Sequence, residues 1–225
     1  MGTRAYAWLF TGLVAAAAAS VTYAVVRFPG VLHDPDAALW LGILVVVFVG
    51  YAYLAVRFLT RDGSAQVRRT GTAFGLIAGA LWLGELWTQA PAGLSPSLER
   101  SVPAICAAAA ALVTLAAGIT EGGLTRDPRC AVLVGLWTGG VSGALMTTGV
   151  IAIQLSHLTL LGTRSDYQAE LARSGGTDMP TYLAGDAIAA SLSHMVINIF
   201  LALLGAGIGA AVAVGLRSAR NAGAS

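Results

Sequence analysis

Long apolar runs, separated by short polar connections, dominate the sequence. Six of them cover approximately residues 5–26, 37–59, 70–89, 102–120, 131–156 and 184–216. A helix of about 20 residues is roughly 30 Å long, which matches the hydrocarbon thickness of a bilayer. The pattern therefore predicts an all-α integral membrane protein, a bundle of six transmembrane helices in a single polytopic domain. The first run continues past the small residues 15–20 that could mark a signal-peptide cleavage site, which favours a retained helix.

Turn-forming residues mark the connections between the runs. Segments 28–36 and 90–100 contain proline and glycine, and 121–130 is also expected to be a loop. The longest polar segment, 157–183, is expected to be an outer loop that carries a short surface helix over 166–174. Ser165 and Gln168 resemble a capping box at the start of this helix, and Gly175 with Gly176 predicts its end.

The composition supports a membrane location and excludes several classes of function. Hydrophobic residues make up 56% of the 225 residues and charged residues 11%, whereas soluble domains are about 25% charged. The net charge of +2 comes without a basic patch that contains aromatic residues, so no nucleic acid is expected as a partner. All 13 basic residues are arginine, a bias that hints at a GC-rich bacterial genome.

The arginines predict the orientation of the chain. Nine fall on the side of the amino terminus and four on the other side: Arg4, Arg57, Arg61, Arg68, Arg69, Arg126, Arg129, Arg217 and Arg220 against Arg27, Arg100, Arg164 and Arg173. Because basic residues concentrate in cytoplasmic loops, both termini are predicted to be cytoplasmic. The expected location is the inner (cell) membrane of a bacterium, with the chain crossing it several times.

Glycines recur at four-residue spacing in three of the runs, so that they line one side of each helix. They are Gly71, Gly75 and Gly79, then Gly135, Gly139 and Gly143, and finally Gly205 and Gly209. Small residues in this pattern allow two helix backbones to approach closely within a membrane. We predict helix-packing faces, with a homodimer seam or a glycine-lined passage as alternatives.

Polar residues within the apolar runs gather toward one side of the membrane. Glu85 is the central candidate because an ionisable group at membrane depth is costly and is by default a functional-site hypothesis. The candidate binding residues, all in the outer third or the outer interface of the predicted topology, are Glu85, Gln89, His157, Asp186, Ser191, His194 and Asn198. The predicted site is an outward-facing polar recess, and the inner half is expected to hold almost nothing comparable. Contact with interfacial water and lipid headgroups is the alternative.

The sequence favours a non-enzymatic multi-pass protein that binds or translocates a small solute, an ion or a proton through this recess. One alternative is a structural or assembly subunit, whose partners would be the lipid bilayer together with a second copy or a membrane subunit. Another is a metal- or haem-dependent redox protein that uses Glu85, His157 and His194 as ligands. No cofactor and no catalytic residue is predicted, because no metal-ligand spacing, GxSxG turn or phosphate-binding GxxxxGK[ST] loop occurs.

Overall fold

The computed structural model describes residues 3–61, 65–89 and 96–222, and every regular element among them is a helix. This confirms the all-α prediction. The long helices are α1 (Thr3–Arg27), α2 (Pro35–Arg61), α3 (Ala65–Gln89), α4 (Pro96–Thr125), α5 (Pro128–Ser156) and α8 (Met179–Ala222). Shorter elements connect them: η1 (Pro29–Leu32) follows α1, and α6 (Leu158–Gly162) and α7 (Ser165–Ser174) lie between α5 and α8.

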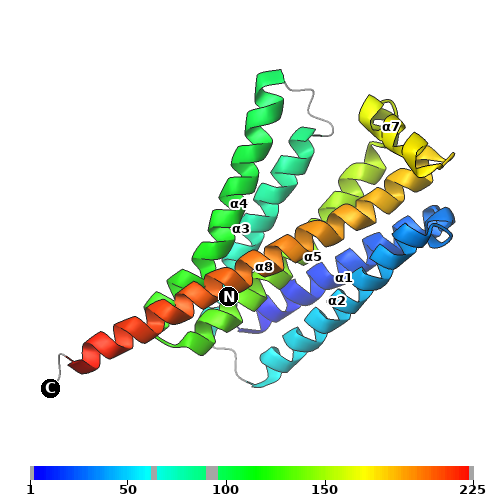
Figure 1. Cartoon of the computed structure of the whole chain (residues 1–225). Helices are drawn as coiled ribbons and strands as arrows, with labels where there is room; N and C mark the ends of the chain where they lie inside the picture. The colour runs from blue at the N-terminus through cyan, green and yellow to red at the C-terminus, as the bar shows by residue number, and fades with distance from the viewer. Residues whose placement is uncertain (1–2, 62–64, 90–95, 223–225) are drawn as a thin grey trace.

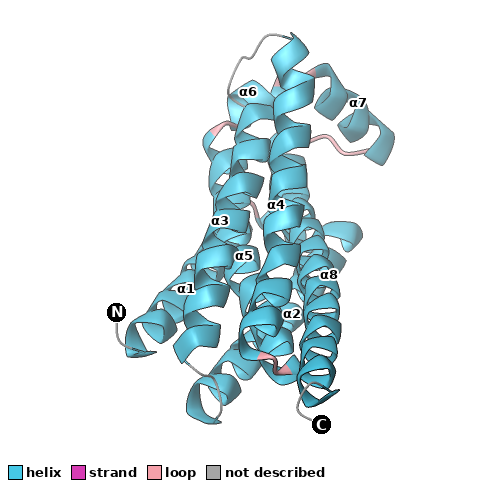
Figure 2. Cartoon of the chain, turned by 90° about the vertical axis from the view of Figure 1, so that its left-hand side faces the viewer, coloured by secondary structure: helices cyan, strands magenta, loops and turns pink. Residues whose placement is uncertain are grey.

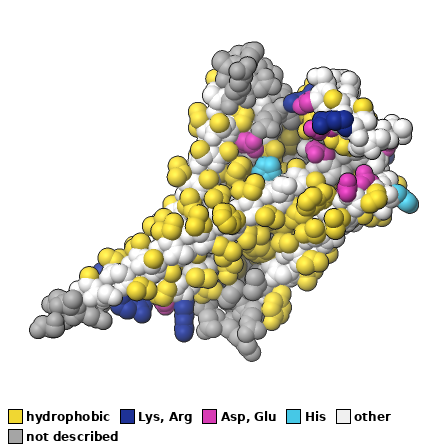
Figure 3. Space-filling view, viewed as in Figure 1, with side chains coloured by type: hydrophobic (Ala, Val, Ile, Leu, Met, Phe, Trp, Pro, Cys, Tyr) yellow, Lys and Arg dark blue, Asp and Glu magenta, His cyan; other side chains and the backbone are white. Residues whose placement is uncertain are grey.

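Within the described residues, five helices are long and apolar enough to cross a membrane: α1, α2, α4, α5 and α8. Helix α3 is not among them, since its sequence mixes apolar residues with Glu85, two arginines and several glycines and threonines. Large apolar side chains cover the outside of the bundle, for example Val26 at 74% exposure and Phe200 at 65%, as the yellow surface in Figure 3 shows. Such a surface suits a lipid environment, so the chain is a helical membrane protein.

Helix α5 forms the centre of the bundle. Of its membrane-spanning residues 72% are buried, against 11% to 28% in the other four helices of this kind. Helices α1, α3, α4 and α8 all pack against it (Figure 1). The start of α1 and the end of α8 lie at one end of the molecule and α7 lies at the other (Figure 2).

Glycines bring α5 close to its neighbours on two sides. A Cβ on Gly71, Gly75 or Gly79 of α3 would come within 2.7 to 2.8 Å of Trp137, Val141 or Leu145 of α5. On the other side, a Cβ on Gly135 would lie 2.6 Å from the Ala202 carbonyl oxygen, one on Gly139 3.1 Å from the Tyr51 hydroxyl and one on Gly143 2.8 Å from Met195. These distances are shorter than ordinary carbon contacts, so the faces are occupied within the chain itself.

The contact between α4 and α8 is tighter still. A Cβ on Gly205 would overlap the backbone of Leu115, and one on Gly209 would overlap the backbone of Gly118. On the α4 side, Gly118 and Gly122 face Gly205 and Gly209 in the same way. The sequence analysis did not select the two α4 glycines, because they lie near the end of an alanine-rich run where small residues are unexceptional.

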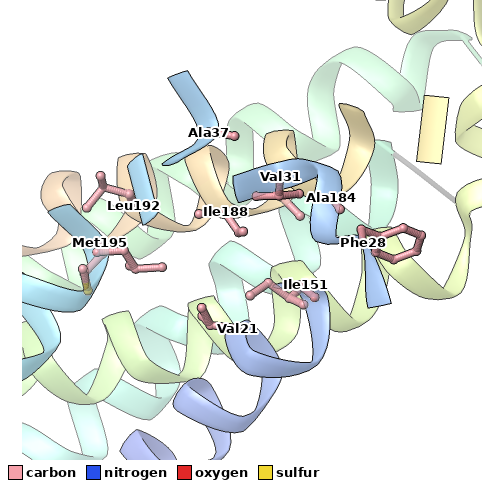
Figure 4. Close-up of a cluster of buried hydrophobic side chains, with 12 residues drawn as sticks. Val21, Phe28, Val31, Ala37, Ile151, Ala184, Ile188, Leu192 and Met195 are labelled. Carbon is pink, nitrogen blue, oxygen red and sulfur yellow. The ribbon is translucent and has the colours of Figure 1, made fainter. Parts of the chain in front are cut away.

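A cluster of buried apolar side chains joins the first two helices to the centre. Val21 of α1, Phe28 and Val31 around η1, and Ala37 of α2 pack against Ile151 of α5 and against residues of α8 (Figure 4). The α8 members are Ala184, Ile188, Leu192 and Met195. Between helices in a membrane, attraction comes largely from van der Waals packing, and this cluster provides it at the end of the bundle near α7.

Two expectations about connections are wrong, and a third connection, expected over 90–100, overlaps α4, which already begins at Pro96. The expected loop over 121–130 is helical up to Thr125, and α5 begins at Pro128, where the Asp127 side chain accepts a hydrogen bond of 3.0 Å from the Arg129 backbone. The chain reverses at Arg126, the one non-glycine residue with positive φ (54°) in the described part. A single left-handed residue and a capped proline turn therefore replace the expected loop, and Glu121 becomes part of α4.

The second wrong expectation concerns the start of α7. Its N-cap is Arg164 and no side chain caps it, so Ser165 and Gln168 do not form a capping box. The Gln168 amide instead donates to the Gly162 carbonyl oxygen at 3.2 Å. The other end agrees with the sequence, since Gly175 adopts the left-handed conformation (φ 73°) that commonly terminates a helix.

Candidate functional site

Glu85 of α3 and His194 of α8 meet in the interior of the bundle. The Glu85 Oε2 atom lies 3.6 Å from His194 Nε2, and the two side chains are 12% and 17% exposed. Helices α3 and α8 each pack against both α4 and α5. The Glu85 and His194 side chains therefore meet inside the group formed by these four helices. Glu85 therefore faces protein and not lipid.

The hydrogen bond at Nδ1 of His194 determines which protonation states its Nε2 atom can offer to Glu85. His194 Nδ1 lies 2.8 Å from the Ala190 carbonyl oxygen. Because a carbonyl oxygen only accepts hydrogen bonds, Nδ1 carries the hydrogen. Nε2 then either offers a lone pair to a protonated Glu85 or, in the imidazolium form, donates toward an ionised one. At 3.6 Å the two atoms are within ion-pair distance but beyond hydrogen-bond distance, so a proton resides on one member or the other.

Trp82 and Asn198 support this pair from the same two helices. The Trp82 Nε1–H group donates to Asn198 Oδ1 at 2.9 Å, and Asn198 Nδ2 donates to the His194 carbonyl oxygen at 2.9 Å. The Trp82 ring also meets the His194 ring edge-on, with the centroids 5.3 Å apart. Asn198 is completely buried, so losing either hydrogen bond would leave a polar group without a partner in a dry environment.

The bundle opens toward the end that carries α7. From the middle of the molecule toward the end that carries α7, α3 and α4 diverge from α5 and α8 (Figure 1). The space-filling view shows a notch between these two halves, with acidic side chains and a histidine side chain at its wall (Figure 3). The notch opens toward the end of the molecule that carries α7 (Figure 3).

A second polar group lies nearer the mouth of the notch. Gln154 of α5 donates to Asp186 Oδ2 of α8 at 3.2 Å. A cavity of about 130 Å³ lies beside Gln154 and is covered by Tyr167 and Arg164 at the start of α7. Burial raises the pKa of Tyr167 from 10.0 to about 12, and the nearby Asp186 charge adds to the effect. The start of α7 thus forms one wall of this cavity.

The other candidate residues are not all brought to the pair. His157 ends α5, where its ring meets Trp87 edge-on at 5.5 Å and its Nδ1 lies 2.8 Å from the Ile153 carbonyl oxygen. Ser191 is buried and donates to the Ala187 carbonyl oxygen of its own helix at 2.7 Å. Gln89 is the last residue of α3, and its side chain lies outside the described part of the structure.

The proposed metal ligands are accordingly separated. Glu85 and His194 are neighbours, whereas His157 packs against Trp87 instead. Among the described residues, no group of three His, Cys, Asp or Glu side chains is close enough to hold a metal ion. Three converging ligands, which a zinc site requires, are therefore not assembled from these side chains.

Sequence reasoning did not select Trp82 or Tyr167, and it placed Gln154 in the outer third without predicting its pairing with Asp186. Trp82 precedes Glu85 by three residues, so helical spacing places both on one face. That spacing was available in the sequence, but a tryptophan in an apolar run is usually a packing residue. Gln154 and Tyr167 become relevant only when the end of α5 and the start of α7 are brought together.

Comparison with known proteins adds no further assignment. No protein-family model, no curated protein and no solved structure matches the chain.

Proposed function

We propose that this protein binds protons at the Glu85–His194 pair from the outer aqueous phase and uses this site to translocate protons across the membrane. The observation that carries the proposal is the 3.6 Å approach of Glu85 to His194, with both side chains largely buried. Histidine is the side chain whose ordinary pKa lies nearest neutral pH, and glutamate and histidine both occur in the proton relays of membrane proteins. Buried titratable groups inside membrane bundles commonly belong to ion or proton pathways.

The surroundings of the pair support a proton in preference to a large solute. Trp82 and Asn198 are hydrogen-bonded to each other beside His194 and fill part of the interior next to the pair. A cavity beside Gln154 measures about 130 Å³, which is small compared with the roughly 300–1,000 Å³ of pockets for drug-sized ligands. Water and protons fit such a space.

The proposal includes a topology with six spans. Helix α3 packs between α4 and α5 within the bundle, and its Glu85 contributes to the interior, which accounts for its lower apolarity. With six spans both termini lie on one side, and the arginine distribution favours the cytoplasm. On this basis the notch opens to the outside of a bacterial inner membrane.

The test is a proton-flux measurement on purified protein in liposomes that enclose a pH-sensitive dye. An inward-directed membrane potential drives protons through the wild-type protein, and we expect Glu85→Gln and His194→Gln each to reduce the flux at least tenfold. Asp36→Asn and His33→Gln are matched controls, because both residues are exposed and lie near η1 and the start of α2, away from the pair. The controls should retain wild-type flux.

Two results would overturn the proposal. One is a wild-type flux no greater than that of protein-free liposomes. The other is a flux that survives Glu85→Gln unchanged in protein whose helical content and elution volume match the wild type.

A further inference from the structure

A second acidic residue is buried at the opposite end of the bundle. Glu121 of α4 has 0% exposure, and neither of its carboxyl oxygens has a hydrogen-bond partner among the described residues. It lies one turn before Thr125, the end of α4, at the end of the bundle where the chain termini lie (Figure 2). The sequence analysis assigned this residue to a loop and expected almost no polar groups in this half.

The neighbours of Glu121 offer no positive charge. The Thr70 side chain of α3 lies close enough to act on the carboxyl, and the Glu121 charge in turn acts on the Cys130 thiol of α5. Among the described residues, no arginine lies within ion-pair distance of Glu121. The Arg68 Nε atom of α3 is also buried without a hydrogen-bond partner among the described residues, but Arg68 forms no ion pair with Glu121. The carboxyl is thus surrounded by α3, α4 and α5 without a counter-charge.

Helix α8 packs against α4 on both sides of Glu121 along the helix, and this contact keeps Glu121 directed into the interior. Gly118 and Gly122, on either side of Glu121 along α4, are in backbone contact with Gly205 and Gly209 of α8. One turn earlier, Ala117 is buried in a cluster with Val67 of α3 and Val134 of α5. Backbone on one side and apolar side chains on another leave the carboxyl pointing into the four-helix interior.

We propose that Glu121 is a second proton-binding site, held in the protonated form inside the bundle and in exchange with the aqueous phase at the end that carries the termini. An isolated charged carboxylate in a dry interior is strongly disfavoured, and a proton or another cation removes that cost. The distance from Glu121 to the end of α4 is about 6 Å along the helix axis. A groove of about 630 Å³ lined by Asp127, Cys130 and Leu133 opens beside that end.

Hydroxyl groups occupy the same interior between the two acidic residues. Thr138 and Ser142, one turn apart on α5, are completely buried, and neither hydroxyl has a hydrogen-bond partner among the described residues. Further along the bundle, Asn198 and Trp82 connect to the Glu85–His194 pair. The half of the bundle nearer the chain termini therefore contains polar groups, and of these buried groups Glu121 lies closest to the end of α4.

Labelling with dicyclohexylcarbodiimide tests the protonated state directly. A protonated carboxyl adds across one C=N bond of this apolar reagent to give an O-acylisourea, which rearranges to a stable N-acylurea; every atom is retained, so the mass rises by one reagent molecule. Trypsin cleaves after arginine, and the peptide 101–126 contains Glu121 as its one acidic residue. The matched control in the same sample is Glu170, on the exposed face of α7, in the peptide 165–173.

We expect labelling of peptide 101–126 at pH 7 in nanodiscs, at least tenfold above that of peptide 165–173, and loss of the adduct in Glu121→Gln. A water-soluble carbodiimide with an added amine should show the reverse preference. In sealed vesicles, raising the pH on the side of the termini should reduce the adduct, whereas raising it on the other side should not.

Absence of an adduct on peptide 101–126 in folded wild-type protein would overturn the inference, and so would labelling that ignores the pH on the side of the termini. The inference does not depend on the proposed proton flux. An adduct on Glu121 in a protein without flux would leave this site standing and refute the proposed function. Because the wild-type protein carries the test, it does not require the Glu121→Gln variant to fold.

Discussion

Gly209 offers the sharpest test of how this bundle is held together. In the structure, a Cβ at this position would overlap the backbone of Gly118 on α4. Backbone atoms cannot rotate out of the way as a side chain can, so Gly209→Ala must push α4 and α8 apart. At Gly207, on the same helix, an added Cβ would meet nothing within 4 Å, which makes Gly207→Ala a matched control.

The size of the difference follows from two effects. Replacing glycine by alanine in a helix gains up to about 1 kcal/mol of helix propensity, and both variants share this gain. Overpacking a close contact costs about 1–3 kcal/mol, and only Gly209→Ala incurs it. We therefore expect Gly209→Ala to be about 2 kcal/mol less stable than Gly207→Ala, or about 30-fold in the unfolding equilibrium, since 1.36 kcal/mol corresponds to a factor of ten.

The assay is reversible unfolding in mixed micelles in which the fraction of dodecyl sulfate is raised, followed by circular dichroism. Gly207→Ala should unfold at or slightly above the wild-type midpoint, and Gly209→Ala well below it. Equal midpoints for the two alanine variants would refute the assignment of Gly205 and Gly209 to the α4 contact. A loss of oligomer without a loss of stability would instead favour the homodimer seam.

Two further predictions concern the polar site. Trp82→Phe removes the donor to the buried Asn198 Oδ1 atom and should lower the free energy of unfolding by about 1–3 kcal/mol. The control is Trp8→Phe, at a ring that is 74% exposed, which should change it by no more than about 0.5 kcal/mol. The same unfolding assay measures both variants, and equal losses would contradict the role given to Trp82. Because burial raises the pKa of Tyr167 from 10.0 to about 12, the folded protein favours the neutral phenol. Its stabilising contribution is complete below pH 10 and is lost as the pH rises toward 12. Tyrosinate absorbance should therefore show one phenol titrating near pH 12 that is missing in Tyr167→Phe, and an unchanged titration curve in that variant would contradict the burial of Tyr167 under α7.

The local pattern of the sequence was sufficient to predict the helical architecture. Apolar runs of membrane length predict helices because a backbone in lipid must satisfy its own hydrogen bonds, and glycine spacing indicates which sides approach closely. The same reasoning selected Glu85 and His194, since an ionisable residue among apolar ones is visible without any structure. In these respects periodicity and residue type carry the information.

What only the tertiary structure decided is which of these residues meet. Glu85 and His194 are more than a hundred positions apart, and their approach depends on how α3 and α8 cross the α4–α5 pair, which no local pattern encodes. His157 has the same chemistry as His194 but lies against Trp87. Glu121 was hidden because Gly122 and Gly123 resemble a turn, whereas the backbone contact with Gly209 holds α4 helical to Thr125. Helix ends and side-chain partners depend on packing between distant segments, and that packing is a property of the whole fold.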